Sequence, residues 1–117
     1  MDLAELVHVV LANDTLAARE WVKEAARRRI EFQTLPEPAG LDATSRALAA
    51  GLVEHLSAQW GQRPPEWARR IGSAPREVWL VQRARKHPAL QARCREHGPE
   101  PLRRRGFFAF PSFLSVA

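Results

Sequence analysis

Three side chains near the end of the chain have types that bind metals. His87, Cys94 and His97 follow one another at intervals of seven and three residues, which a helix would bring toward one face. Zinc needs about three or four ligands with matched geometry, and Pro88 redirects the chain directly after His87. We therefore predict no metal and no cofactor. Cys94 is also a poor candidate nucleophile, because a thiol on an apolar helix face is expected to be buried and inert.

Paired carboxylates could perform acid and base chemistry, and Glu20 and Glu24 stand one helical turn apart. Lys23 and Arg27 are within one turn of them, so ion pairs on a solvated helix face are the favoured interpretation. The chain contains no Gly-x-Ser-x-Gly turn, no phosphate-binding glycine loop and no His-Glu-x-x-His pair. The sequence therefore predicts a protein that is not an enzyme.

The charge is divided unequally along the chain. Residues 1–60 hold 6 Lys and Arg against 9 Asp and Glu, whereas residues 61–117 hold 12 against 4. The basic half contains a triple arginine followed by phenylalanines, a combination suited to an acidic or apolar partner. We predict that a protein partner contacts the cations Arg103, Arg104 and Arg105 and the apolar anchors Trp67, Phe107 and Phe108.

Burial is the alternative role for these phenylalanines, and the residue type favours it. Leaving a phenylalanine in water costs roughly 2 kcal/mol, so the rings are expected to close the core and the arginines to form a solvated rim around it. Both interpretations stay open on the sequence alone.

Length and composition predict one small domain in the cytoplasm. The chain has 117 residues, 45% of them hydrophobic, and a formal net charge of +5. Its apolar stretches are far shorter than the about 20 residues that span a bilayer, and no signal peptide is apparent. A single cysteine excludes an internal disulfide. We expect no membrane association, and a homodimer remains open.

Hydrophobic periodicity predicts an all-α bundle of about five to seven short helices in a single domain over residues 1–117. A Pro/Gly linker is expected at 36–41 and an irregular basic and aromatic C-terminal segment, rich in Pro and Phe, at 98–117. Residues 77–82 suit a strand as well as a helix. The expected helices span residues 2–12, 15–29, 42–60, 65–71, 76–86 and 88–97.

A helix-turn-helix unit over residues 65–86 is an alternative basis for function. Ala68, Gly72, Val78 and Val81 have the small, glycine and apolar types that this motif needs at its contacts and turn. Trp79 and Leu80 would face the groove where polar side chains are expected, so DNA binding is the less favoured alternative. Its contacts would be Arg69, Arg70, Arg76, Arg83, Arg85 and Lys86.

Three short segments carry a resemblance across most of the chain: residues 18–22 (Ala-Arg-Glu-Trp-Val), 64–67 (Pro-Pro-Glu-Trp) and 101–106 (Pro-Leu-Arg-Arg-Arg-Gly). They are similar to segments of small helical bacterial proteins from GC-rich genomes, in the style of antitoxin or regulator components of toxin-antitoxin units. This resemblance implies a helical regulator whose protein partner is a co-expressed toxin or enzyme. A typical antitoxin combines a clear DNA-binding module with a flexible tail, and this chain departs from that pattern.

Overall fold

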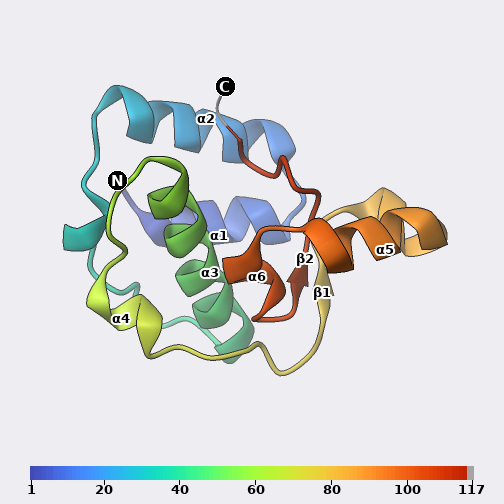
Figure 1. The fold of residues 1–117 in the computed structure, drawn as a ribbon. Helices are drawn as coiled ribbons and strands as arrows, with labels where there is room; N and C mark the ends of the chain where they lie inside the picture. Colours follow the sequence, from blue (N-terminus) through green and yellow to red (C-terminus); the bar gives the residue numbers. More distant parts are fainter. Residues whose placement is uncertain (116–117) are drawn as a thin grey trace.

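The computed structural model describes residues 1–115 as a mainly helical globule with a two-stranded sheet (Figure 1). Six α-helices and two short 3-10 turns occur in this part of the chain. In chain order the elements are α1 (Leu3–Leu11), α2 (Thr15–Arg27), η1 (Phe32–Thr34), α3 (Ala43–Gln59), α4 (Glu66–Arg69), β1 (Val78–Trp79), η2 (Gln82–Lys86), α5 (Pro88–His97), α6 (Glu100–Arg103) and β2 (Phe107–Phe108).

The long helix α3 forms the centre of the core. Its leucines Leu48, Leu52 and Leu56 recur every four residues and are fully buried, as the sequence predicted. The Asp42 carboxylate begins the helix by accepting a hydrogen bond of 2.8 Å from the Ser45 backbone N–H. Helices α1, α4 and α6 all pack against α3, and α2 packs on α1.

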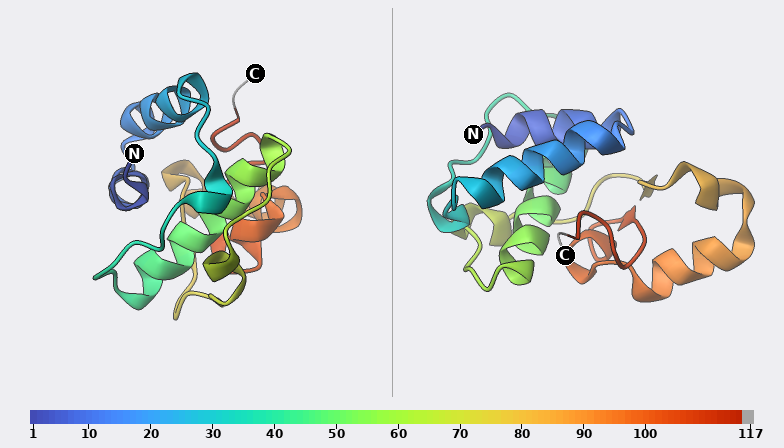
Figure 2. Two further views of the ribbon diagram at one scale, coloured as in Figure 1. Left: turned by 90° about the vertical axis from the view of Figure 1, so that its left-hand side faces the viewer. Right: turned by 90° about the horizontal axis from the view of Figure 1, so that it is seen from above.

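Helices α1 and α2 form a hairpin at one side of α3 (Figure 2). Asn13 makes the turn between them with a φ of 60°, a conformation that asparagine tolerates better than most residues. Trp21 secures the other end of the hairpin, because its indole N–H donates to the Asp2 carbonyl at 3.0 Å. The predicted helices at 2–12 and 15–29 are therefore confirmed with slightly shorter bounds.

The predicted helix over residues 76–86 does not form, and the fold is consequently not strictly all-α. Val78 and Trp79 form strand β1, which runs parallel to β2 with Val78 opposite Phe107. The Val78 and Leu80 backbone N–H groups donate to the Gly106 and Phe108 carbonyls at 2.8 and 2.9 Å. β-branched and aromatic side chains favour this extended pairing. A helix-turn-helix unit is absent from 65–86, since α4 leads into a strand and not into a second helix.

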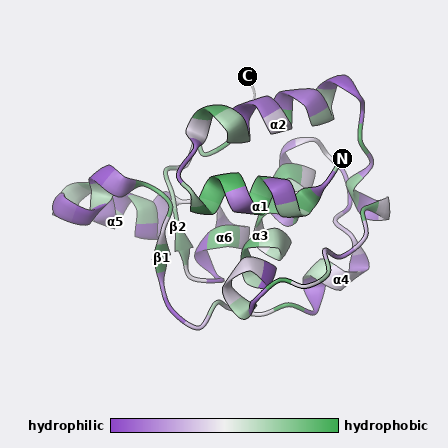
Figure 3. Cartoon of the chain, turned by 180° about the vertical axis from the view of Figure 1, so that it is seen from behind, coloured by the Kyte–Doolittle hydropathy of each residue, from purple (hydrophilic) through white to green (hydrophobic). Residues whose placement is uncertain are grey.

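Residues 82–97, comprising η2 and α5, project from the rest of the protein, and we call this segment the basic arm (Figures 1 and 2). A second, smaller apolar cluster attaches the arm to the sheet, with Ala84, Cys94 and Phe108 buried at its centre. Arg95 lies over the Trp79 and Phe108 rings at 5.1 and 4.7 Å from their centroids. Hydrophilic residues predominate on the arm, whereas α1 is mostly hydrophobic (Figure 3).

Gly98 ends α5 where two backbone segments meet, and this contact gives a testable prediction. A Cβ atom at Gly98 would lie 2.5 Å from the Cys94 carbonyl oxygen and 2.7 Å from that of Ala109. Gly98→Ala should therefore lower the free energy of unfolding by about 1–3 kcal/mol, because backbone must move to relieve the overlap. Urea unfolding followed by tryptophan fluorescence measures this loss.

Gly72→Ala is the matched control, because a Cβ atom at Gly72 would meet nothing within 4 Å. It should change the free energy of unfolding by less than about 0.5 kcal/mol. Equal effects of the two substitutions would show that the packing at Gly98 is looser than described here.

Candidate partner-binding site

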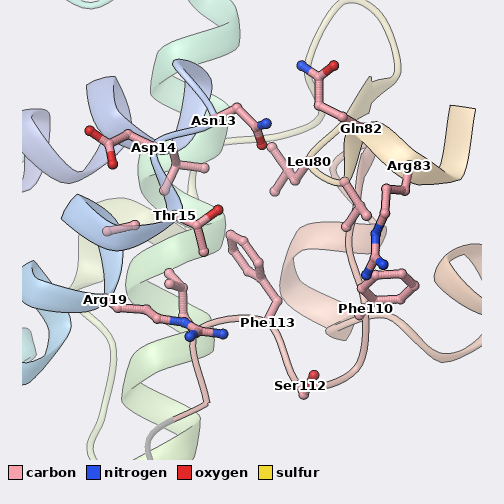
Figure 4. Close-up of a pocket in the computed structure, with 14 residues that line it drawn as sticks. Asn13, Asp14, Thr15, Arg19, Leu80, Gln82, Arg83, Phe110, Ser112 and Phe113 are labelled. Carbon is pink, nitrogen blue, oxygen red and sulfur yellow. The ribbon is translucent and has the colours of Figure 1, made fainter.

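A pocket with a volume of about 320 Å³ opens where the α1–α2 turn, the segment after β1 and the C-terminal strap meet (Figure 4). We define the strap as residues 109–115. The three segments are far apart in the sequence and each supplies both apolar and polar lining residues. The pocket is thus a product of tertiary packing and not of any single motif.

The inner surface of the pocket is apolar. Val10, Ala18, Leu80 and Leu114 line it, and each is a buried member of the main core. Phe113 from the strap is half-buried and completes the wall, with its ring turned toward the space between the segments (Figure 4). An apolar lining of this kind favours a hydrophobic side chain as occupant.

Two side chains of α3 hold the strap in place. The His55 Nε2–H donates to the Phe113 carbonyl oxygen at 2.7 Å, and the Gln59 amide donates to that of Leu114 at 3.3 Å. The His55 and Phe113 rings also stack with their centroids 6.4 Å apart. Leu114 adopts a φ of 52°, which is strained for a bulky residue. Such strain persists only where surrounding contacts enforce it, and the α3 contacts do so here.

The rim of the pocket is basic. Arg19 of α2 and Arg83 of η2 approach it from opposite sides (Figure 4). Both are exposed, and within residues 1–115 neither has a carboxylate at ion-pair distance. The acid beside them, Asp14, is engaged as the N-cap of α2 and accepts the Ala17 N–H at 3.0 Å. The rim can therefore attract an anionic group.

Two exposed leucines lie beside pocket-lining residues in the chain. Leu16 is 71% exposed and Leu11 is 40% exposed, and they flank the α1–α2 turn whose residues line the pocket. Leu16 stands three residues before Arg19 on α2, so the two lie on neighbouring parts of the helix surface. Exposed large apolar side chains are a feature of interaction sites.

The basic arm carries further cations beyond Arg83. Arg95 on the arm is neutralised by Glu77, with Nη2 and Oε2 2.8 Å apart. Four other cations of the arm have no carboxylate at ion-pair distance in the described part of the chain: Arg83, Arg85, Lys86 and Arg93. The apolar pocket therefore lies beside the basic surface of the arm.

The triple arginine, by contrast, is largely occupied by contacts within the protein. Arg105 is 2% exposed and its guanidinium donates to the backbone carbonyls of Ala68, Ile71 and Pro101. It also forms an ion pair with Glu54. The expected solvated rim therefore does not include Arg105, because the ends of α4 and α6 need its donors. We remove Arg105 from the candidate contact surface.

Arg103 and Arg104 are more exposed than Arg105, but they too form contacts within the protein. Arg104 is exposed and pairs with Glu54 at 2.6 Å and with Glu100 at 3.7 Å. Arg103 is half-buried, and its Nη1 donates to the Glu96 carbonyl at the C-terminal end of α5. The Arg103 contact stabilises the junction between the arm and α6, whereas the Arg104–Glu54 pair joins the end of α6 to α3.

The aromatic candidates lie mainly inside the protein. Phe107 is 0% exposed and Phe108 is 7% exposed, so both close apolar clusters as the core interpretation expects. Trp67 is half-buried, and its indole N–H donates to the Leu35 carbonyl at 2.8 Å. None of these three residues lines the pocket described above.

The cations of the DNA-binding alternative do not form one cluster. Arg83, Arg85 and Lys86 share η2 on the basic arm, whereas Arg69 belongs to α4 and Arg70 follows it on another side of the protein (Figure 1). Arg76 is exposed just before β1. The fold therefore brings together only the second half of this set.

Sequence reasoning missed most of the pocket residues. Arg19 looked like one more cation on a charged helix face, and Leu80, Phe110 and Phe113 looked like core. The one available signal was Leu16, a large apolar residue outside the face of α2 formed by Ala18, Trp21 and Ala25. An apolar residue on the polar side of an amphipathic helix indicates a contact surface.

His55 makes the stability of the strap depend on pH. Burial is the main cause that lowers the pKa of His55 from its ordinary value of 6.5, opposed by its hydrogen bond to Phe113. The unfolded chain therefore binds a proton at a higher pH than the folded protein does. The stability that neutral His55 provides is complete above about pH 6.5 and is lost as the pH falls through the lower folded-state pKa. The urea concentration at the unfolding midpoint should accordingly decrease when the pH is lowered from 7.5 to 5.5.

His55→Gln separates this effect from other titrations, because glutamine cannot titrate in this range. Its urea midpoint should vary less between pH 7.5 and 5.5 than that of the wild type. Equal pH dependence in both proteins would remove His55 as the cause.

No known protein-family model, curated protein or solved structure matches this chain. Within residues 1–115, no helix combines the length and apolarity that a membrane crossing needs. His87 and His97 are exposed whereas Cys94 is buried between them, and no three His, Cys, Asp or Glu side chains of the described residues gather closely enough to hold a metal ion. The case for function therefore depends on the geometry of the pocket and the arm.

Proposed function

We propose that this protein is a non-enzymatic binding protein that recognises an acidic partner protein through the pocket and the basic arm. The observation that supports this most is the apolar pocket between two arginines without acidic partners in the described chain, Arg19 and Arg83. Protein interfaces combine a desolvated apolar centre with a charged rim, and arginine is enriched in them. A small cytoplasmic regulator is the role we assign.

The chemistry of the pocket favours binding over catalysis. Among the side chains that line it, Asp14 is the only carboxylate, and it is engaged in capping α2. Its hydroxyl groups, on Thr15 and Ser112, have no histidine beside them in the lining to act as a base. The motif resemblance to antitoxin components makes a co-expressed toxin or enzyme the first partner to test.

A photo-crosslinking residue placed on the pocket rim tests the proposal. With p-benzoylphenylalanine at Leu16, ultraviolet irradiation in the native host should link the protein to one partner protein. With the same residue at Ala58, an exposed position of α3 outside the pocket lining, that link should be absent. Identical products from both positions, or none from Leu16, would contradict the proposal.

DNA binding through the basic arm is the second candidate. Arg85, Lys86 and Arg93 are exposed together on a projecting segment without acidic partners in residues 1–115, and phosphate binding uses such clusters. Phosphates do not need the apolar pocket or the exposed leucines, so these features favour a protein partner.

Fluorescence anisotropy with a labelled generic duplex separates the two candidates. Phosphate binding would give micromolar affinity that decreases steeply between 50 and 200 mM salt, and Arg85→Ala combined with Arg93→Ala would abolish it. We expect no such binding at moderate salt. Tight, salt-sensitive binding lost in that double variant would favour DNA over the acidic protein.

A further inference from the structure

We infer that the pocket receives a large apolar side chain of an acidic amphipathic segment, whose carboxylates contact Arg19 and Arg83. This inference rests on the proposed function and specifies the chemistry that the partner must present. It commits to a segment of a different protein, with leucine-sized residues on one face and Asp or Glu on the flanks. The size of the pocket, the charge of its rim and the two exposed leucines each limit which partner segment can bind.

The size of the pocket selects side chains over larger ligands. Its volume of about 320 Å³ is at the lower end of the about 300–1,000 Å³ found for ligand sites. Val10, Leu80 and Phe113 provide an apolar lining and leave no unpaired charge at its base. One or two apolar side chains fill such a space, while polar ligands would lose hydration without gaining partners.

The two arginines determine the sign of the partner. They flank the apolar opening on opposite sides (Figure 4), so carboxylates on both flanks of an inserted residue can each meet a guanidinium. Arg85, Lys86 and Arg93 extend the positive field along the arm. A second copy of this chain suits the rim poorly, because the chain carries a formal net charge of +5.

The exposed leucines indicate that the partner is longer than the pocket. Leu16 and Leu11 lie next to lining residues in the chain and outside the lining itself. An amphipathic helix places apolar residues at successive turns, so one residue can fill the pocket while its neighbours cover these leucines. A small molecule in the pocket would leave them exposed.

The probe for this inference is a fluorescein-labelled 15-residue peptide with leucines at helical spacing on one face and glutamates on both flanks. A control peptide has the same composition in an order that produces no apolar face. Fluorescence anisotropy at about 50 mM salt should show binding of the first peptide only. Arg19→Glu and Arg83→Glu should each weaken that binding at least tenfold, since each reverses one charge at the opening.

Arg70→Glu is the matched control, because Arg70 is exposed after α4, belongs to neither the pocket lining nor the basic arm, and receives the same reversal of charge. It should weaken binding less than threefold. Ser112→Trp places a large side chain at an exposed lining position and should compete with the peptide for the pocket. Circular dichroism checks that all four variants keep the wild-type fold.

Several outcomes would overturn the inference. They are binding of both peptides alike, an equal loss for Arg70→Glu and Arg83→Glu, no binding of the amphipathic peptide at 100 µM, and wild-type affinity in Ser112→Trp. A dimer detected by analytical ultracentrifugation that dissociates in Arg19→Glu would also overturn it, by assigning the pocket to a second copy. A specific crosslink at Leu16 together with any of these results would leave the proposed function intact and remove only the pocket chemistry.

Discussion

Replacing Arg105 with methionine is expected to lower the free energy of unfolding by about 3–5 kcal/mol, the range for breaking a buried, hydrogen-bonded charge pair. The guanidinium donates to the Ala68, Ile71 and Pro101 carbonyls at 3.0, 3.2 and 2.9 Å. Methionine fills a similar volume but supplies no donors. Because small proteins have only about 5–15 kcal/mol of stability, this loss would leave the fold marginal. Urea unfolding followed by tryptophan fluorescence measures it.

Arg104→Met is the matched control, since Arg104 pairs with the same Glu54 carboxylate but its side chain is 47% exposed. Its loss should stay within about 1 kcal/mol, as for other exposed ion pairs. The free energy of unfolding of Arg105→Lys should remain well below that of the wild type, because one ammonium group cannot reach three separate carbonyls. A methionine variant at 105 that is as stable as the one at 104 would show that the buried contacts contribute little.

Phe107→Ala should lower the free energy of unfolding by about 3–5 kcal/mol, because truncating a buried phenylalanine leaves a cavity. Phe107 is fully buried and its strand partner is Val78. This substitution separates a core role for the ring from the role of a partner anchor. The urea midpoint, measured with the wild type in the same buffer, reports the loss.

Phe113→Ala provides the comparison, because Phe113 is half-buried and lines the pocket. It should destabilise the fold much less than Phe107→Ala and should weaken peptide binding, since the pocket wall is removed. Equal stability losses would assign both rings to the core. A Phe107→Ala protein with wild-type stability would contradict the packing described here.

The helices that carry strong local signals were predictable. α3 begins at an Asp N-cap and repeats leucine every four residues, and α1 and α2 have similar caps. Helix α5 (Pro88–His97) also has the bounds expected from the sequence. Residues 76–86 were not predictable, because Val78 and Trp79 suit either a helix or a strand. Their partners, Phe107 and Phe108, lie far along the chain, and only that long-range pairing decides for the strand.

The same limit applies to the candidate site. The triple arginine is conspicuous in the sequence, yet Arg105 is used to satisfy carbonyls of α4, an element that precedes it by more than thirty residues. Arg19 and Arg83 are unremarkable in the sequence and become a pair only through tertiary structure. Local patterns identify residues with binding chemistry, whereas burial by distant segments decides which of them face solvent.

Hydrogen exchange of the protein with and without its crosslinked partner shows whether the partner covers the pocket. We expect the purified partner to slow exchange at the α1–α2 turn, at residues 80–83 and in the strap, the three segments that line the pocket. Slower exchange confined to residues 85–97 of the basic arm, with the pocket segments unchanged, would contradict it.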